Sequence, residues 1–458
     1  MSDLRKKIFE SGKTVSRKAR SRQQSAQASP ASSRDGSRAT SRHVSEEEDE
    51  SDYDYDDSLA SSLVNSEDGD EAGRAPPSEV LHGHIVDLLD QKRDSGQDRE
   101  TKLTAYTELI RHHPVAEEVE GQMDDIIPML LKSVRGRRTA QGVTWALKAL
   151  MMTILTTGTE SIHDRVYPTL KNLCENSDFD DHNEEIKVAS IRAMAISTMC
   201  GGGSVTAAEE FLEFLIGIVQ SDGHVIDAGD NGPVVAAALD AWGFIASSLD
   251  DLEEQSTEAL EAFMEQLDSS DVDVQIAAGS NIALLLEAAR DYEEETGETW
   301  NMRYDQDALL RNLNALTRES SKSISKKDRR QLHSSFSSVV TSLEHGKGPG
   351  YSTARRFASN PHTGGNKSDF KNEYQEYGYR QKLRIQNISI IIDSWSLSAR
   401  LGMLKSVLGG GLASHYLNNS VVRDLLSGAK TEYLSAPSKD RPSHRSGHGK
   451  KAGKGVFD

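Results

Sequence analysis

The chain has 458 residues and a formal net charge of −19 at pH 7, and only 36% of its residues are hydrophobic. Its first residues lack the apolar core of a signal peptide, and no run approaches the ~18 apolar residues of a membrane span. The two cysteines, Cys174 and Cys200, stand apart in apolar surroundings, so neither a disulfide framework nor a zinc site is indicated. We therefore expect a protein of the cytoplasm, the nucleus or both, with no membrane association.

Charge divides the N-terminal part into two stretches of opposite sign. Residues 1–43 carry a net charge of +8, and residues 44–74 carry −12. Both are poor in large apolar side chains, so they cannot bury enough surface to offset the entropy of ordering. Residues 1–74 are therefore predicted to be a disordered basic Ser/Arg arm followed by an acidic run. The arm holds a basic cluster that is a candidate for RNA contact or, alternatively, for a nuclear-localisation signal: Arg17, Lys18, Arg20 and Arg22.

Helical periodicity begins at Ser78 and continues to about Leu343. Apolar residues recur at helical spacing, as in Leu81, Ile85 and Leu88, and short turns rich in Gly, Asn, Asp and Ser separate the patterns. No alternating strand pattern competes with them. Residues 75–345 are therefore predicted to be an all-α domain.

A short element recurs along this helical region. It consists of a usually small residue, three spacers, and then Ala or Asn followed by a large apolar residue, and the copies are 40 to 48 residues apart. This spacing is close to the ~40–47 residues of armadillo and HEAT repeats, whose helix pairs bury their apolar faces only when they are stacked. The predicted fold class is therefore an all-α, armadillo/HEAT-like helical-repeat solenoid with a small C-terminal helical motif region and disordered charged termini. The copies end on Ala105-Tyr106, Ala149-Leu150, Ala193-Met194, Ala241-Trp242 and Asn281-Ile282.

The helical region is strongly acidic. Residues 75–320 carry a net charge of −28, so their surface repels phosphate. We expect this region to bind protein partners, a basic segment in particular, and not nucleic acid. Alternatively, the acidic exterior serves only solubility.

The C-terminal third is basic, because residues 321–427 carry a net charge of +9. Gly, Ser, Asn, Pro and Arg dominate residues 346–371, which are predicted to be a flexible linker. Residues 372–427 are predicted to be a compact signature region, with one extended stretch followed by short helices near 397–408, 411–418 and 420–427. Residues 428–458 are predicted to be a disordered basic tail.

Two further basic clusters are candidates for RNA contact. Lys326, Lys327, Arg329 and Arg330 open the last long helix, and Arg380, Lys382 and Arg384 interleave with tyrosines. Basic and aromatic side chains together suit RNA backbones and exposed bases. The alternatives are a solvated helix face for the first cluster and tyrosines packed on the solenoid for the second.

The sequence offers no constellation for catalysis, metal binding or a cofactor. The histidines have no ligand spacing, and the carboxylates occur in runs typical of solvated faces rather than of tuned acid–base pairs. We therefore expect a non-enzymatic protein with no cofactor, no metal and no small-molecule substrate.

The segment Ile390–Leu426 resembles the C-terminal signature of the interferon-related developmental regulator family. The helical region 75–345 is similar to the armadillo-like domain of that family. Tyr416 and Leu426 depart from the family pattern, which has a leucine and an aromatic residue at these positions. The resembling residues include Trp395, Leu404, Lys405, Gly409, Gly411, His415, Asn419, Arg423 and Asp424.

The resemblance implies a regulator of gene expression without catalytic activity, linked either to ribosomes or to transcriptional co-regulation. We interpret Trp395 and Leu404 as core and Asn419 as a helix cap. His415, Arg423 and Asp424 form either a surface ion pair or cap, or a contact with a partner or ribosomal RNA. Two functions remain open: an RNA or ribosome binder that uses the basic regions, and a nuclear scaffold whose acidic solenoid holds basic protein tails or a histone-modifying complex.

Overall fold

The structure is a computed structural model, and it describes residues 75–90, 95–136, 139–176, 182–300, 302–318, 325–357 and 374–433. The predicted N-terminal arm, with Arg17, Lys18, Arg20 and Arg22, lies outside the described residues. So does the tail from residue 434 onward.

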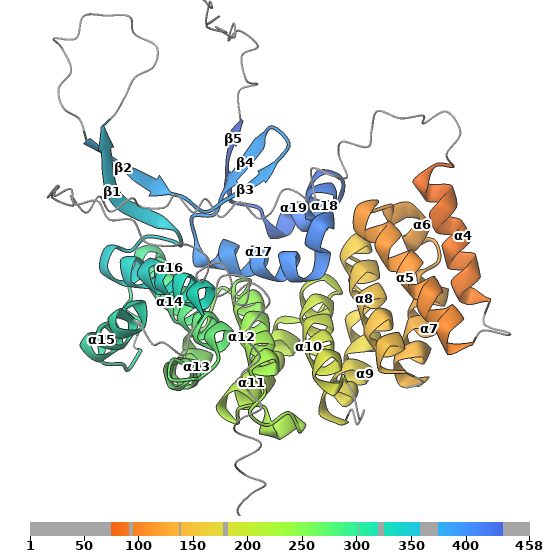
Figure 1. Cartoon of the computed structure of the whole chain (residues 1–458), viewed down its shortest axis with the longest axis horizontal. Coiled ribbons are helices and arrows are strands. Elements are labelled where there is room, and N and C mark those ends of the chain that lie inside the picture. The colour runs from red at the N-terminus through yellow and green to blue at the C-terminus, as the bar shows by residue number, and fades with distance from the viewer. Residues whose placement is uncertain are drawn as a thin grey trace, which may run out of the picture. The chain divides into compact units, whose positions relative to one another are not determined.

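The helical region consists of two layers of helices (Figure 1). In layer A each helix packs against the next, and in layer B each helix covers the layer A helix that follows it in the chain. Layer A comprises α5 (Gly96–His112), α8 (Ala140–Thr157), α10 (Asn183–Cys200), α12 (Gly232–Ala246) and α14 (Val272–Thr296). Layer B comprises α4 (Pro77–Leu89), α7 (Met123–Gly136), α9 (His163–Asn176), α11 (Val205–Gln220) and α13 (Glu253–Gln266). The short helices α6 (Ala116–Glu120) and η2 (His224–Ile226) lie in connections, and the pair α15 (Gln306–Thr317) and α16 (Lys326–His345) follows α14.

This architecture confirms the predicted all-α helical-repeat solenoid. The five copies of the recurring element fall on the five helices of layer A. Its small residue permits close approach of neighbouring helices, and the bulky residue that follows is fully buried in every copy. These bulky residues are Tyr106, Leu150, Met194, Trp242 and Ile282.

Local capping explains where these helices begin and end. Ser95 and Asp98 form a capping box at the start of α5, and Asn231 and Asp271 accept hydrogen bonds from the first turns of α12 and α14. The helix α14 ends at Gly297, whose φ of 73° is accessible to glycine at low cost.

By length and hydropathy alone, α14 could cross a membrane, which the sequence was not expected to allow. Its most apolar window is 61% buried inside the protein. The helix packs against α12, α13 and α16, as the core helix of a repeat domain does.

Two small antiparallel sheets follow the helical region. The strands β1 (Tyr351–Phe357) and β2 (Tyr374–Tyr379) form one sheet. The strands β3 (Lys382–Ile385), β4 (Ile388–Ile391) and β5 (Lys430–Tyr433) form the other, in the order β3-β4-β5.

Two of these strands lie where the sequence predicted no structure. Residues 351–357 were expected to belong to a flexible linker, and residues 430–433 to a disordered tail. The first stretch pairs with β2, where the Tyr351 and Tyr379 rings meet at 5.0 Å and the Tyr351 hydroxyl donates to Glu376 Oε2 at 2.6 Å. Pairing between distant segments leaves little trace in local periodicity, and this explains the difference.

The predicted helices of the signature region are present. They are α17 (Trp395–Leu408), α18 (Leu412–Asn418) and α19 (Ser420–Leu425), with the short η3 (Gly409–Gly411) between the first two.

Candidate functional site

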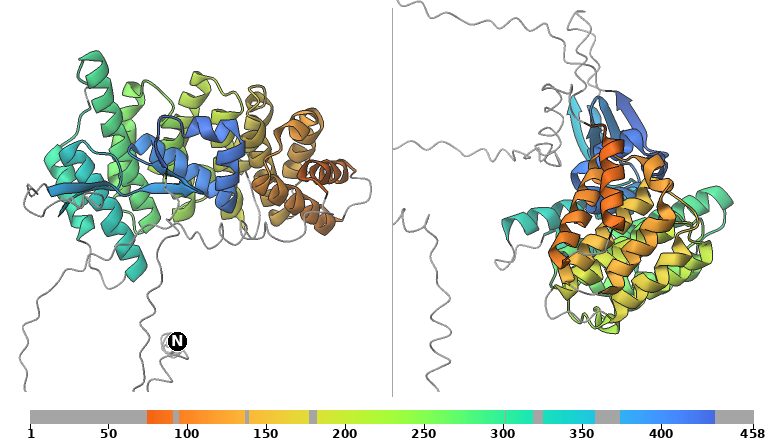
Figure 2. Two further views of the ribbon diagram at one scale, coloured as in Figure 1. Left: turned by 90° about the horizontal axis from the view of Figure 1, so that it is seen from above. Right: turned by 90° about the vertical axis from the view of Figure 1, so that its right-hand side faces the viewer.

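The helices of the signature region dock on layer A. The helix α17 packs against α8, α12 and α14, while η3 and α18 pack against α5 and α19 packs against α8 (Figure 2). We call the elements α17, η3, α18 and α19 together the C-terminal clasp. The clasp joins parts of the chain that are more than two hundred residues apart, and the sequence gave no prediction for or against such docking.

The burial pattern of layer A records this docking. The first half of each helix from α8 to α14 alternates between buried and accessible residues, whereas the second half is buried on all sides. A helix that is buried all round must be covered on both faces. The fully buried runs are Ala149–Thr156, Ala193–Thr198, Ala241–Ala246 and Asn281–Glu287.

The N-terminus of α17 rests on a buried carboxylate of α14. Glu287 Oε1 accepts hydrogen bonds from the backbone N–H groups of Trp395 at 2.7 Å and Ser396 at 3.2 Å. A carboxylate at this position satisfies free helix donors and complements the helix dipole. Burial raises the pKa of the Glu287 carboxyl to about 7, and the two hydrogen bonds only partly oppose this effect. The Trp395 indole N–H donates to Ser342 Oγ of α16 at 2.8 Å, which ties a third helix to the same point.

The middle of α17 is fixed by an arginine. Arg400 Nε donates to Ser247 Oγ at 3.0 Å, and a second guanidinium nitrogen of Arg400 donates to the Ser247 carbonyl at the end of α12. Burial lowers the pKa of this guanidinium. The side chain therefore satisfies carbonyl and hydroxyl groups at a helix end, where a cation is favourable.

The η3–α18 turn fits closely against α5. Gly411 has no room for a side chain, because a Cβ atom there would lie 2.1 Å from the Arg111 carbonyl oxygen. His415 Nε2 lies 3.1 Å from the Ile110 carbonyl oxygen, which can only accept, so Nε2 carries the proton. Burial lowers the pKa of His415 to about 4, so this imidazole is neutral.

Asn419 connects the last two helices of the clasp to α8. Its Nδ2 donates to the Leu155 carbonyl at 2.9 Å and to His415 Nδ1 at 3.1 Å. Its Oδ1 accepts from the backbone N–H of Val421 at 2.9 Å and so caps α19, as the sequence predicted.

The signature residues therefore serve mainly to hold the clasp on the solenoid. Trp395 and Leu404 are core residues, as predicted, and Lys405 is partly buried on α17. His415 is fully buried and contacts α5, so its expected place in a surface ion pair is wrong. Gly409, with a φ of 51°, forms the break between helices, and Arg423 and Asp424 are exposed on α19.

The two described basic clusters lie on different parts of the molecule. Lys326, Lys327, Arg329 and Arg330 occupy the first turns of α16, whereas Arg380, Lys382 and Arg384 lie on β3 and in the turn before it. The first sheet contacts the far half of α16, where Ser338 Oγ accepts from the Gly350 N–H. At 1.5 Å per residue this point is roughly 18 Å along the helix from Lys326, so the clusters do not form one site.

The second cluster has the mixed aromatic and basic character that was predicted. The Arg380 guanidinium lies over the Tyr377 ring, 5.2 Å from its centroid, and both side chains are exposed. Lys382 pairs with Glu432 at 2.8 Å, and Arg384 is exposed. We call Tyr377, Arg380, Lys382 and Arg384 the strand patch.

Within the described ranges, no group of three or more His, Cys, Asp or Glu side chains is placed to hold a metal ion. Both cysteines are buried, and burial raises the pKa of each thiol to about 12.

Comparisons with known proteins point to one family. The profile described as "Interferon-related developmental regulator (IFRD)" matches residues 37–344. An uncharacterized protein of Schizosaccharomyces pombe is 27% identical over 363 residues, which cover 76% of this chain and 74% of that protein. Interferon-related developmental regulator 1 of Sus scrofa is 23% identical over 79% of this chain and 74% of its own length. Interferon-related developmental regulator 2 of Mus musculus is 29% identical over 42% of this chain and 36% of its own length.

Proposed function

The chain belongs to the interferon-related developmental regulator family, a family of regulators of gene expression, and on that premise we propose that it acts by binding RNA on ribosomes. In this proposal the basic C-terminal third and the N-terminal arm contact RNA. The acidic solenoid serves as a scaffold for protein partners, and the protein performs no catalysis.

The observation that carries this proposal is the combination of charge partition and docking. Residues 321–427 have a net charge of +9 and residues 75–320 a net charge of −28. Because the clasp holds the first region on the second, the strand patch is presented from a folded support. Exposed Arg and Tyr side chains on strands suit phosphates and unstacked bases, which RNA offers in its single-stranded parts.

Layer A also offers a surface for a protein partner. The residue before the conserved-position alanine of the recurring element is Lys148 in α8, Arg192 in α10 and Asp240 in α12. Lys148 lies over the Trp145 ring at 4.6 Å, while Asp240 is accessible but surrounded by protein, which raises the pKa of its carboxyl to about 6. These side chains lie on the half of layer A whose residues alternate between buried and accessible, where an extended partner segment could meet them.

A second candidate function is a nuclear co-regulator scaffold that binds basic protein tails or a histone-modifying complex. The acidity of residues 75–320 favours it, since acidic repeat surfaces suit basic guests. It differs from the first in requiring no contribution from the strand patch.

Binding of the full-length protein to a single-stranded RNA probe, measured from about 50 to 200 mM salt, tests the first function. Each phosphate contact contributes a slope of about −0.7 to the dependence of log K on log salt. The double variant Arg380→Glu/Arg384→Glu should weaken binding and flatten this slope by about 1.

The matched control is Arg303→Glu/Arg311→Glu, which reverses two exposed charges on the acidic domain. Equal losses in both double variants would indicate a net-charge effect and would count against the strand patch. Deletion of the C-terminal third is a poorer test, because it would uncover the buried half of layer A.

A further inference from the structure

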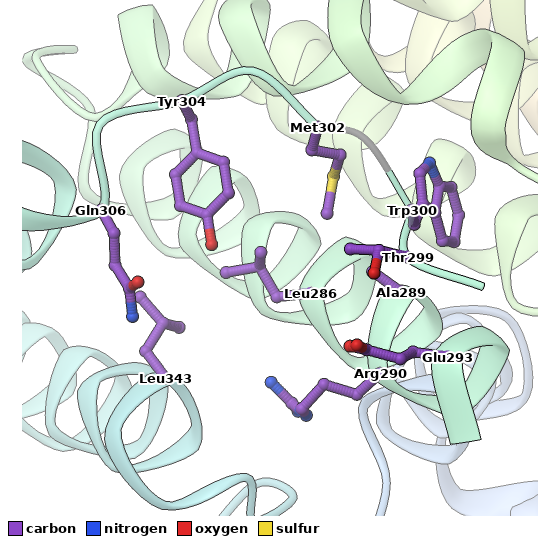
Figure 3. Close-up of a pocket in the computed structure, with 10 residues that line it drawn as sticks. All are labelled: Leu286, Ala289, Arg290, Glu293, Thr299, Trp300, Met302, Tyr304, Gln306 and Leu343. Atoms are coloured by element: carbon purple, nitrogen blue, oxygen red, sulfur yellow. The ribbon is translucent and has the colours of Figure 1, made fainter. Parts of the chain in front are cut away.

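A pocket opens beside the last turns of α14, away from the strand patch (Figure 3). It lies between α14, the connection from Gly297 to Asp305, and the last turns of α16. Its volume is about 250 Å³. For comparison, a cavity of ~150 Å³ in another protein binds benzene, so this pocket can hold a phenyl ring.

The walls of the pocket are apolar and aromatic, and its edge is polar. Leu286 and Leu343 face it from α14 and α16, and the connection adds Trp300, Met302 and Tyr304 (Figure 3). The connection is held in place by Trp300, whose ring meets the Tyr292 ring edge-on at 5.9 Å. The Trp300 side chain is more than nine-tenths buried, and its indole N–H has no acceptor among the described residues. Such a donor favours a guest that brings an oxygen.

The surroundings of the pocket are acidic. Glu293 and Arg290 lie at its edge, and α14 and the turn after it carry four further exposed acids. A guest therefore needs an apolar group for the pocket and positive charge beside it. The four acids are Asp291, Glu294, Glu295 and Glu298.

One segment of this chain outside the described residues has this chemistry. Residues 450–458 read KKAGKGVFD, in which three lysines precede Val456 and Phe457. These two are the only large apolar residues after Leu434. An aromatic residue in an otherwise polar and basic stretch is typical of a short segment that docks on a folded surface.

We propose that residues 450–458 dock on this pocket within the same chain. Phe457 fills the apolar cavity, the lysines face the acids around it, and a backbone carbonyl of the segment accepts from the Trp300 indole. Asp458 then faces Arg290, the basic residue at the pocket edge.

The chain is long enough to reach. Glu287, one turn before Arg290, binds the start of α17, and Asp393 just before α17 pairs with Lys430 at 2.8 Å. The last described strand therefore leaves the fold close to the pocket. The 24 residues from Tyr433 to Phe457 span up to about 80 Å when extended, so the tether allows docking and raises the local concentration of the segment.

The test uses the full chain with the photoreactive residue p-benzoylphenylalanine in place of Phe457. Irradiation followed by peptide mapping should give an adduct within the monomer to the peptide that contains Trp300, Met302 and Tyr304, or to that of Leu343. Adducts to other parts of the chain, adducts of dimer size, or no adduct above the level of unfolded protein would overturn the proposal.

A second measurement follows the Trp300 indole N–H by NMR in full-length protein labelled at its tryptophans. Phe457→Ala and Lys450→Glu/Lys451→Glu should shift this signal. Phe9→Ala serves as the matched control, because Phe9 also follows a basic cluster. A shift with Phe9→Ala but not with Phe457→Ala would overturn the proposal and assign the pocket to the N-terminal arm.

Discussion

At the scale of single residues, Glu287 is the group whose ionisation is coupled to clasp docking. Its pKa rises from an ordinary value of 4.5 to about 7 because it is buried beneath α17. A carboxyl with a raised pKa costs stability where it is ionised in both states, which is above pH 7. The cost disappears as the pH falls through 7 toward 4.5, because the docked state then binds a proton that the undocked state does not. Asp291 has a pKa raised in the same direction by burial and adds to this trend.

The variant Glu287→Gln should remove most of this dependence. The glutamine carbonyl can still accept from the Trp395 and Ser396 N–H groups, but it carries no buried charge. We expect wild-type protein to gain stability relative to the variant between pH 8 and pH 5, by on the order of 3 kcal/mol at most. Thermal unfolding of both proteins across this range measures the difference, and parallel pH profiles would refute the assignment.

Two adjacent glycines provide a sharp test of the η3–α5 contact. A Cβ atom at position 411 would collide with the Arg111 carbonyl oxygen, whereas at position 410 the nearest atom is the His112 Cε1 at 4.0 Å. Gly411→Ala should therefore destabilise the protein by more than about 2 kcal/mol, while Gly410→Ala should cost less than about 1 kcal/mol. Denaturant unfolding of the two variants decides this, and similar losses in both would mean that the turn does not pack as described.

At the scale of elements, the clasp and layer A depend on each other. Leu404 is fully buried on α17, so Leu404→Asp should release the clasp by placing an unpaired charge in the interface. Hydrogen exchange should then rise in the runs Ala149–Thr156 and Ala241–Ala246 but stay unchanged in α9 and α11 of layer B. Ser406→Asp, at an exposed position of the same helix, is the control and should leave all four segments unchanged. Uniform exchange across both layers after Leu404→Asp would argue for global unfolding instead.

The elements also show what sequence reasoning can and cannot reach. The repeat period predicted layer A, because the small and bulky residues recur at a fixed interval. The docking of the clasp was not predicted, although uninterrupted apolar runs such as Ala241–Ala246 indicate helices that are covered on both faces. The strand β1 was missed because its stability comes from pairing with β2 across a long interval and not from its own pattern.

At the residue level the signature was assigned correctly only in part. Trp395, Leu404 and Asn419 have the core and cap roles expected from their residue types. His415 was placed at the surface because a polar residue among polar neighbours gives no sign of a carbonyl partner three hundred positions away.

At the scale of the whole molecule, a basic region is held on an acidic one. This arrangement gives the protein two surfaces of opposite chemistry, one suited to RNA and one suited to basic protein segments. The clasp makes them one unit, so that binding at either surface can be studied with substitutions that leave the fold intact.

The most direct test of this account is sucrose-gradient sedimentation of lysates from growing and starved cells, at low and high salt. The account predicts that wild-type protein sediments with monosomes at low salt, leaves them at high salt, and is lost from them in the Arg380→Glu/Arg384→Glu variant but not in the Arg303→Glu/Arg311→Glu control. Protein that stays at the top of the gradient under both growth conditions would contradict the ribosome proposal and would leave the nuclear scaffold as the working function.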